Sequence, residues 1–277
     1  MASQRNSVPV LMYHEVADAS QIDELSSVTQ RNYIVTHELF EQHLAALAAA
    51  HASSISLGSL RAWQRGEASL PENPVVITFD DGYVGNVKYA LPLLAKHGFT
   101  ATFFIVTNLI GARHMMSWEQ LRELQQHGMG IESHSVSHPL LSTLDRSRTL
   151  SELAESKRIL QDGLGATVSH FALPYGDSND FYDEAIRHAG YDSGCSSRIG
   201  LNDRDTSPFL LRRVAMTSGT TPEQLARIAR QDPTLMKSMQ RRADLKRTVS
   251  RILGKNNYNR LVNLYYGVKS EPGQTAP

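Results

Sequence analysis

Val75-Val-Ile-Thr-Phe-Asp-Asp-Gly82 is the stretch of sequence that decides the fold. Its first five residues form an apolar, β-branched run, which predicts a strand buried on both faces, as in a parallel sheet. Asp80 and Asp81 follow at once, and Gly82 favours a tight turn into the next element. Because the C-terminal ends of parallel strands face the functional side of the sheet, we expect both aspartates there.

Adjacent carboxylates at the end of a strand repel each other, so one must be neutralised or the pair must meet a cation. Asp80 and Asp81 therefore indicate a metal site or an acid–base site. The same residues would also serve an ordinary polar turn, with an aspartate as a helix cap. Asp-Asp-Gly alone leaves both interpretations open.

Similar units flank this stretch, because short apolar runs alternate with capped helical patterns over about 200 residues. Ser117, Thr149 and Thr221 each begin a capping-box pattern, which predicts helix starts. This alternation predicts a barrel-like parallel α/β fold, with an open doubly wound sheet as the alternative. The expected strands are 8–13, 75–79, 100–106, 130–133, 168–173 and 210–216, and the expected helices are 36–50, 84–96, 117–128, 149–162, 180–189 and one from 221.

Two histidines follow the expected strand 130–133, in His134-Ser-Val-Ser-His138. Two imidazoles at this spacing can converge on one cation if the backbone turns between them. Pro139 disfavours the α region for His138, so we expect a helix to begin at Pro139. Two histidines and a carboxylate form a common hydrolytic zinc set with open coordination positions. One aspartate would then bind the metal, while its neighbour accepts a proton from water. Loop histidines with ordinary hydrogen bonds are the alternative.

Three motifs, Thr78-Phe-Asp-Asp-Gly82, His134-Ser-Val-Ser-His138 and Phe171-Ala-Leu-Pro-Tyr-Gly176, resemble in order and spacing those of polysaccharide deacetylases. These are the NodB-homology domains of carbohydrate esterase family four. The resemblance covers roughly residues 8–216. Leu11-Met-Tyr-His-Glu15 is similar to the branch that deacetylates poly-N-acetylglucosamine exopolysaccharides.

The resemblance implies an α/β fold with a distorted (β/α)7-type barrel. It implies hydrolysis of acetamide groups on N-acetylglucosamine-type units of a polysaccharide or oligosaccharide. Asp80 would be the general base. A divalent metal ion, with zinc as the default, would be bound by Asp81, His134 and His138.

The third motif would form one wall of the substrate groove, through Pro174 and Tyr175. In the family, the tyrosine backbone amide helps to hold the oxyanion, which is the electrostatic stabilisation that acyl transfer requires. Taken without the other motifs, the same residues describe a turn with an aromatic plug.

The chain departs from the family pattern at two positions. Many members have an arginine before the proline of the third motif, where Ala172 and Leu173 stand here. Arg213 is the candidate replacement partner for the base. Many members also have a late histidine as general acid, whereas the last histidine here is His188. His14 is the candidate proton donor, and a buried structural histidine is the alternative.

Two other functions stay open at this point. The chain could deacylate a lipid-linked sugar intermediate or a small cyclic amide. It could also be a non-catalytic carbohydrate-binding module built on a decayed deacetylase, an interpretation that the missing arginine and late histidine favour and the intact aspartate and histidine motifs oppose.

Composition sets further limits on the class of protein. Lysine plus arginine equals aspartate plus glutamate at 28 each, so overall charge gives no argument for nucleic acid as a partner. Cys195 is the only cysteine, which excludes an intrachain disulfide and a cysteine-rich zinc site. The N-terminal residues do not resemble a signal peptide, so we expect a cytoplasmic protein or one peripheral to the membrane; a removed leader would leave the same sequence.

The C-terminal part turns basic, with apolar residues interspersed. This pattern predicts a basic amphipathic helix that meets an anionic membrane or a partner, with a helix packed on the barrel as the alternative. We therefore expect a deacetylase domain over 1–220 and a helical extension over 221–277. The basic residues are Lys237, Arg241, Arg242, Lys246, Arg247, Arg251, Lys255 and Arg260, with Asp244 as the one acid among them.

Overall fold

The computed structural model describes residues 6–25, 30–176 and 180–253. The chain forms two compact units that divide between Asp232 and Pro233. This division lies later than the boundary expected at residue 220, because the helix that begins at Pro222 belongs to the first unit. The second unit contains one described helix, α9 (Pro233–Leu253).

The first unit is built on a parallel sheet whose strands follow the order β10-β1-β5-β6-β7-β8-β9. All pairs along this order are parallel, which agrees with the expected strand–helix alternation. A short strand, β4, pairs with the beginning of β5, and β2 pairs with β3 in a separate small sheet. The strands are β1 Val10–Tyr13, β2 Glu15–Ala17, β3 Ile34–Thr36, β4 Ser53–Ser54, β5 Pro74–Phe79, β6 Thr102–Ile105, β7 Gly130–Ser133, β8 His170–Ala172, β9 Ser193–Cys195 and β10 Val214–Ala215.

The sheet curls until its two ends meet. Val214 in β10 pairs with Leu11 in β1, and Leu211, just before β10, forms a parallel bridge with Cys195 in β9. Two backbone hydrogen bonds of 2.8 Å, from Ser196 N to Leu211 O and from Leu211 N to Gly194 O, hold this junction. The expected distorted seven-stranded barrel is confirmed, and its first and last strands are neighbours.

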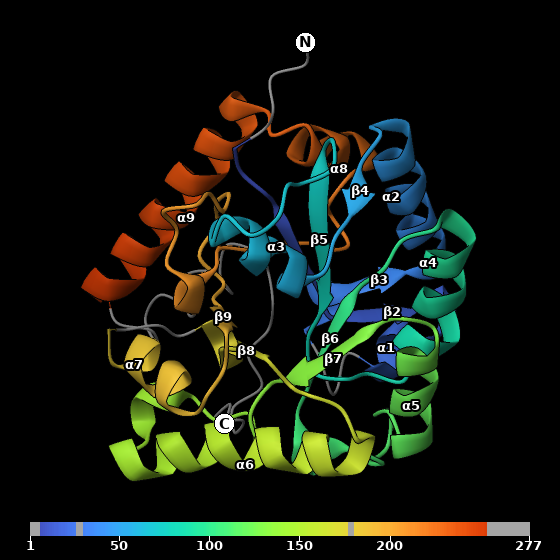
Figure 1. Ribbon diagram of the computed structural model, residues 1–277. Helices are drawn as coiled ribbons and strands as arrows, with labels where there is room; N and C mark the ends of the chain where they lie inside the picture. Colours follow the sequence, from blue (N-terminus) through green and yellow to red (C-terminus); the bar gives the residue numbers. More distant parts are fainter. Residues whose placement is uncertain (1–5, 26–29, 177–179, 254–277) are drawn as a thin grey trace. The chain divides into compact units, whose positions relative to one another are not determined.

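Helices surround the strands of this unit (Figure 1). The capping boxes expected at Ser117 and Thr221 are confirmed, and Gly98 ends α4 in the left-handed conformation. The helices are α1 Ile22–Leu25, α2 His37–Ala49, α3 Leu57–Gln64, α4 Leu91–His97, α5 Trp118–Gln126, α6 Arg146–Leu164, α7 Asp180–His188 and α8 Pro222–Ala229.

Two helix predictions were wrong in detail. Helix α6 begins at Arg146, because the Asp145 side chain accepts a hydrogen bond from Arg148 N and caps it; Thr149 lies inside the helix. The helix expected over 84–96 begins with a π-helical turn, Asn86–Ala90, and becomes α-helical only at Leu91.

An aromatic ladder outside the barrel sets the direction of the side chains of His14 and Asp80. Tyr13, Phe79 and Phe103 stand opposite one another on β1, β5 and β6, with ring centroids 5.3 and 4.7 Å apart, and Phe40 of α2 packs on Tyr13 and Phe79. Successive side chains of a strand point to opposite faces. The residues that follow Tyr13 and Phe79, which are His14 and Asp80, therefore turn toward the barrel axis.

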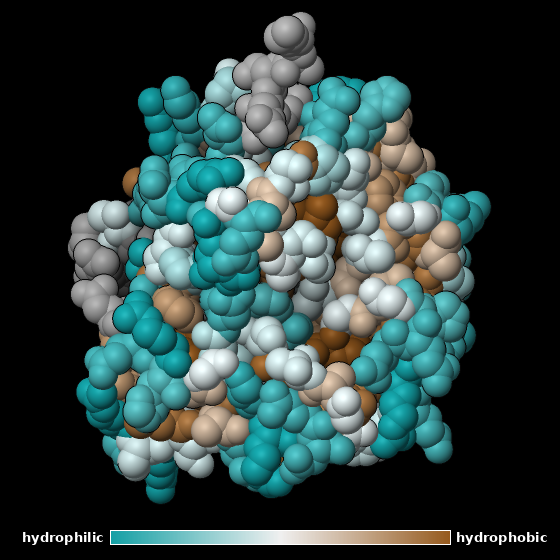
Figure 2. Space-filling view, viewed as in Figure 1, coloured by the Kyte–Doolittle hydropathy of each residue, from teal (hydrophilic) through white to brown (hydrophobic). Residues whose placement is uncertain are grey.

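Hydrophilic side chains cover most of the face shown in Figure 2, and hydrophobic colour is confined to scattered recesses. Within the described part of the chain, no helix combines the length and the apolar character that crossing a membrane requires.

Candidate active site

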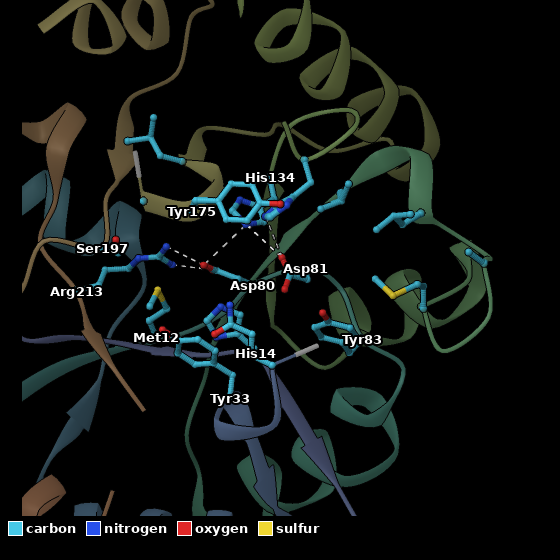
Figure 3. A pocket seen from close by; sticks show the side chains of 18 of the residues that line it. Met12, His14, Tyr33, Asp80, Asp81, Tyr83, His134, Tyr175, Ser197 and Arg213 are labelled. Carbon is cyan, nitrogen blue, oxygen red and sulfur yellow. Dashed lines mark hydrogen bonds and ion pairs between the residues drawn. The ribbon is translucent and has the colours of Figure 1, made fainter. Parts of the chain in front are cut away.

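A cavity of about 610 Å³ opens at the C-terminal ends of the barrel strands (Figure 3). It collects the site residues that the sequence predicted, with the exception of Pro174, from segments that lie far apart along the chain. The lining residues include His14, Tyr33, Asp80, Asp81, Tyr83, Leu109, Met115, His134, His138, Leu173, Tyr175, Ser197 and Arg213.

Asp81, His134 and His138 place one donor atom each within 4.8 Å of one another. Asp81 Oδ1 lies 3.4 Å from both His134 Nε2 and His138 Nε2. Two ligands at about 2.1 Å from a tetrahedral ion lie about 3.4 Å apart, so the spacing fits a shared divalent metal. His134 Nδ1 is 2.8 Å from the Ala172 carbonyl, which leaves Nε2 as the nitrogen that faces the cavity. These three residues can therefore hold a metal ion.

The two ligand loops depend on left-handed backbone. Asp81 has φ 74°, which aspartate tolerates better than most residues and which turns its side chain away from that of Asp80. Ser135 and His138 have φ 71° and 55°. The helix expected to begin at Pro139 was wrong: His138 avoids the right-handed α region by adopting the left-handed one, and the next helical turn is a 3-10 turn at Leu141–Thr143.

Asp80 is buried beside these candidate metal donors and paired with Arg213. Arg213 Nη1 and Nη2 donate to Asp80 Oδ1 and Oδ2, both at 2.7 Å, so the two planar groups are joined by parallel hydrogen bonds. Arg213 also donates to Ser196 O at 3.0 Å. The structure thus pairs Arg213 with Asp80, as expected of the candidate replacement for the family's arginine.

Burial and charge act in opposite directions on these groups. Burial alone would raise the pKa of Asp80, but the guanidinium of Arg213 outweighs it and holds that pKa below its usual range. The pKa of Asp81 is also lowered, because the hydrogen bond and charge of His134 overcome burial. Burial and the repulsion of His134 lower the pKa of His138 to about 4. Both carboxylates are ionised at neutral pH, and His138 is a neutral donor.

His14 lies on the opposite wall of the cavity, at the end of β1 (Figure 3). Its ring packs on Tyr33, with centroids 4.4 Å apart and planes inclined at 33°. Burial lowers the pKa of His14, while Asp81 and Asp80 oppose that effect. His14 thus lines the cavity without a hydrogen-bond partner for its buried Nδ1 among the described residues.

Tyr175 and Pro174 form a short turn after β8, as the sequence predicted. Tyr175 has φ 58°, the residue is 56% exposed, and its ring centroid lies 4.7 Å from that of His138. Gly176 also has positive φ, and a Cβ there would stand 1.7 Å from Ser197 Oγ, so this turn requires glycine. Pro174 is buried and does not line the cavity, so the prediction that it forms part of the groove wall was wrong.

Three residues near the site escaped the sequence reasoning: Tyr33, Asn86 and Glu152. Asn86 accepts from Val16 N at 3.0 Å and donates to the His14 carbonyl at 2.7 Å. Glu152 accepts hydrogen bonds from the loop between the two histidines. Their partners lie 15 to 72 positions away, so no local pattern reveals them.

Comparison with known proteins bears on the family of the chain. The family model described as "Polysaccharide deacetylase" matches residues 67–194. The chain is 30% identical over 212 residues to "Putative polysaccharide deacetylase YxkH" of Bacillus subtilis, covering 76% of this chain and 72% of that protein. The chain belongs to the polysaccharide deacetylase family. It is therefore a hydrolase of the class that acts on amide bonds of polysaccharides.

Two further proteins are similar to this chain over most of its length. The poly-β-1,6-N-acetyl-D-glucosamine N-deacetylase of Staphylococcus aureus is 27% identical over 233 residues, which cover 77% of this chain and 80% of that one. The deacetylase PplD of Streptococcus pyogenes, solved in complex with acetate, superposes with a TM-score of 0.73 at 25% identity, covering 79% of this chain and 96% of that chain. This deacetylase thus shares its fold and most of its length with enzymes named for N-deacetylation or deacetylation.

Proposed function

We propose that this deacetylase is metal-dependent and hydrolyses acetamide groups on N-acetylglucosamine-type units of a polysaccharide, with β-1,6-linked polymers as the first class to test. The observation that supports it best is the juxtaposition, in one cavity, of the Asp81, His134 and His138 donors with the arginine-held carboxylate of Asp80. The relationship to a poly-β-1,6-N-acetyl-D-glucosamine N-deacetylase supports the choice of substrate.

A divalent ion at these donors, with zinc the expected one, would polarise the scissile carbonyl and lower the pKa of water. Asp80 is ionised and adjacent, so it accepts the proton of the attacking water. Its two oxygens are oriented by Arg213, and Oδ2 lies 3.9 Å from His134 Nε2. The Tyr175 amide would stabilise the developing oxyanion. The protonated form of His14 would deliver a proton to the departing amine.

The test measures acetate release from β-1,6-linked and β-1,4-linked N-acetylglucosamine oligomers. The protein is compared as purified, after chelation and after return of zinc. We expect activity that disappears on chelation and returns with zinc. Asp80→Asn should lose at least about 100-fold in kcat, in the range typical of general acid–base groups. Asp205→Asn, at an exposed aspartate away from the cavity, should behave as wild type.

Two results would redirect the proposal. Equal turnover in chelated and zinc-loaded protein would contradict the role of the metal. No acetate from any oligomer, with zinc bound, would contradict this substrate class and favour a lipid-linked N-acetylated sugar or a binding role, which the same assay distinguishes when a lipid-linked N-acetylglucosamine is supplied.

A further inference from the structure

The loop His134–His138 carries two of the three candidate metal donors, one at each end. Two of its five residues, Ser135 and His138, have positive φ. Non-glycine residues in this region cost free energy, and such backbone persists only where its surroundings hold it in place. What holds this loop therefore decides how far apart the two imidazoles lie.

Glu152, on helix α6, holds the middle of the loop from outside the cavity. Its Oε2 accepts hydrogen bonds from Val136 N at 2.8 Å and from Ser137 N at 2.9 Å. Its Oε1 accepts a third, from Ser137 Oγ, at 2.7 Å. Hydrogen bonds to a carboxylate are about twice as strong as neutral ones. One side chain thus engages two consecutive backbone amides between the histidine ligands.

Helix α6 is itself anchored to the strand that leads into the loop. Ser156, one turn after Glu152, lies with its Oγ 2.7 Å from Ser133 Oγ at the end of β7. Both serines are fully buried. Within the loop, Ser135 Oγ accepts from His138 N at 3.0 Å. The end of β7 and the middle of the loop are therefore both hydrogen-bonded to the same turn of α6.

We propose that Glu152 is a positioning residue for metal binding: it fixes the loop so that His134 Nε2 and His138 Nε2 both face Asp81 Oδ1. The inference rests on the proposed metal site, but Glu152 bonds to the backbone of Val136 and to Ser137, and it acts on the ligand side chains only through that loop. Carboxylates that orient metal-binding groups in this way change metal affinity by roughly 10- to 100-fold when they are removed.

The experiment measures zinc dissociation constants on the full chain, by competition with a chelating indicator, at a temperature where circular dichroism shows every variant folded. Glu152→Ala should bind zinc roughly 10- to 100-fold more weakly than wild type. Glu152→Gln retains an oxygen acceptor for the two amides and a polar group for Ser137 Oγ, so it should recover most of the affinity.

Glu155→Ala is the matched control. Glu155 lies one residue before Ser156 on the same helix, but its carboxylate pairs with the exposed Arg158. The zinc affinity of Glu155→Ala should equal that of wild type. In the metal-free chain, the amide hydrogens of Val136 and Ser137 should exchange faster in Glu152→Ala and at the wild-type rate in Glu155→Ala.

Each outcome bears on one conclusion. Unchanged zinc affinity in Glu152→Ala, or an equal loss in Glu155→Ala, overturns the positioning role while the metal site stands. A wild-type chain that binds no zinc overturns both. If Glu152→Ala does not fold, Ser137→Ala takes its place: this variant removes only the Oε1 contact and should weaken zinc binding by a few-fold. Wild-type affinity in Ser137→Ala overturns the role.

Discussion

Asp80 and Arg213 form an ion pair in which both side chains are at most 3% exposed. Removing one partner of such a pair leaves an uncompensated buried charge, which costs about 3–5 kcal/mol. We expect Arg213→Met to lower the free energy of unfolding of the metal-free chain by that amount at neutral pH. Arg212→Met changes the exposed neighbouring arginine and should shift the free energy of unfolding by less than about 0.5 kcal/mol. Urea unfolding measures both.

The sign of the pH dependence follows from the lowered pKa of Asp80. The pair stabilises the fold above the usual aspartate pKa, and this stabilisation is lost as pH falls through the lower folded value. The difference in the free energy of unfolding between wild type and Arg213→Met should therefore become smaller in acid. A difference that is constant from neutral pH to below about pH 4 would show that lost packing, and not the charge pair, is the cause.

His14 gives a prediction for the pH profile of turnover. Burial lowers its pKa below 6.5, so the imidazole is mostly neutral at neutral pH and gains its proton as pH falls. If His14 donates the proton to the leaving amine, kcat/KM should decline as pH rises through that lowered pKa, and His14→Gln should lose this decline together with most of kcat. An unchanged alkaline limb in His14→Gln would assign the proton to another group.

Glu15, the neighbour of His14, is 1% exposed, and its Oε2 has no hydrogen-bond partner among the described residues. Burial raises its pKa to about 8, against the opposing hydrogen bond from Gly85. Because the folded state holds this proton longer than the unfolded state, stability should fall as pH rises from about 4.5 to 8, by on the order of 4 kcal/mol.

Glu15→Gln should remove this dependence, so its stability relative to wild type should grow with pH across the same window. Thermal unfolding of the metal-free chain at about pH 5 and pH 8 measures the difference. Glu119→Gln, at an exposed glutamate, provides the comparison and should follow wild type at both pH values. Equal stability differences for Glu15→Gln at both pH values would contradict the buried, proton-holding carboxyl.

Among the elements, the π-helical turn after β5 has a specific use. It places the Asn86 side chain, which is fully buried, between Val16 N and the His14 carbonyl. Short π-helical segments often occur at functional sites. Asn86→Leu would leave a donor and an acceptor unpaired, at about 1–3 kcal/mol each, and would free the end of β1 that carries His14.

We expect Asn86→Leu to lower both the free energy of unfolding and kcat, with the zinc dissociation constant unchanged, since no metal donor of the described cluster lies on this turn. Chemical unfolding, acetate release and zinc titration together measure the three quantities. Asn108→Leu makes the same substitution at an exposed asparagine and should behave as wild type in stability. Wild-type kcat in the Asn86→Leu variant would show that His14 needs no such support. Weaker zinc binding would place the effect on the metal site instead.

The elements also show where sequence reasoning succeeds. Strand β5 and the capping boxes at Ser117 and Thr221 were predictable because their determinants are local: an apolar run, or a polar side chain three residues from its partner amide. Thr149 begins a pattern of the same kind, but the helix there is capped by Asp145, four residues earlier.

The residues of that discarded pattern found other partners. Thr149 Oγ1 bonds to the Asp145 carbonyl within the helix, and Glu152 bonds to the histidine loop. Nothing local distinguishes a glutamate that closes a capping box from one that reaches a distant loop. The grouping of the candidate metal donors Asp81, His134 and His138 was predictable from motif order. The side chains that support the histidine loop and His14 were not, because their contacts depend on how α6 and the π-helical turn pack.

At the scale of the whole molecule, charge is unevenly distributed along a chain that is neutral overall. The sequence of helix α9 (Pro233–Leu253) contains six basic residues and one acidic one. We predict that the full chain cosediments with phosphatidylglycerol vesicles but not with phosphatidylcholine vesicles, and that salt weakens the binding. Arg241→Glu with Arg242→Glu should abolish it, while Arg122→Glu with Arg148→Glu, elsewhere in the chain, should not. Equal sedimentation with neutral vesicles would contradict an electrostatic contact.

The barrel closes by pairing its first strand with its last, and Arg213 stands at that seam. During synthesis, the segments that carry Asp80, Asp81, His134 and His138 are made before Arg213 is added. A product interrupted before residue 213 would therefore bring the metal donors together around a carboxylate with no countercharge, beside an unpaired edge of β1. The segment that pairs with β1 would also bring the countercharge of Asp80, so closure of the barrel and neutralisation of the buried carboxylate would occur in a single step.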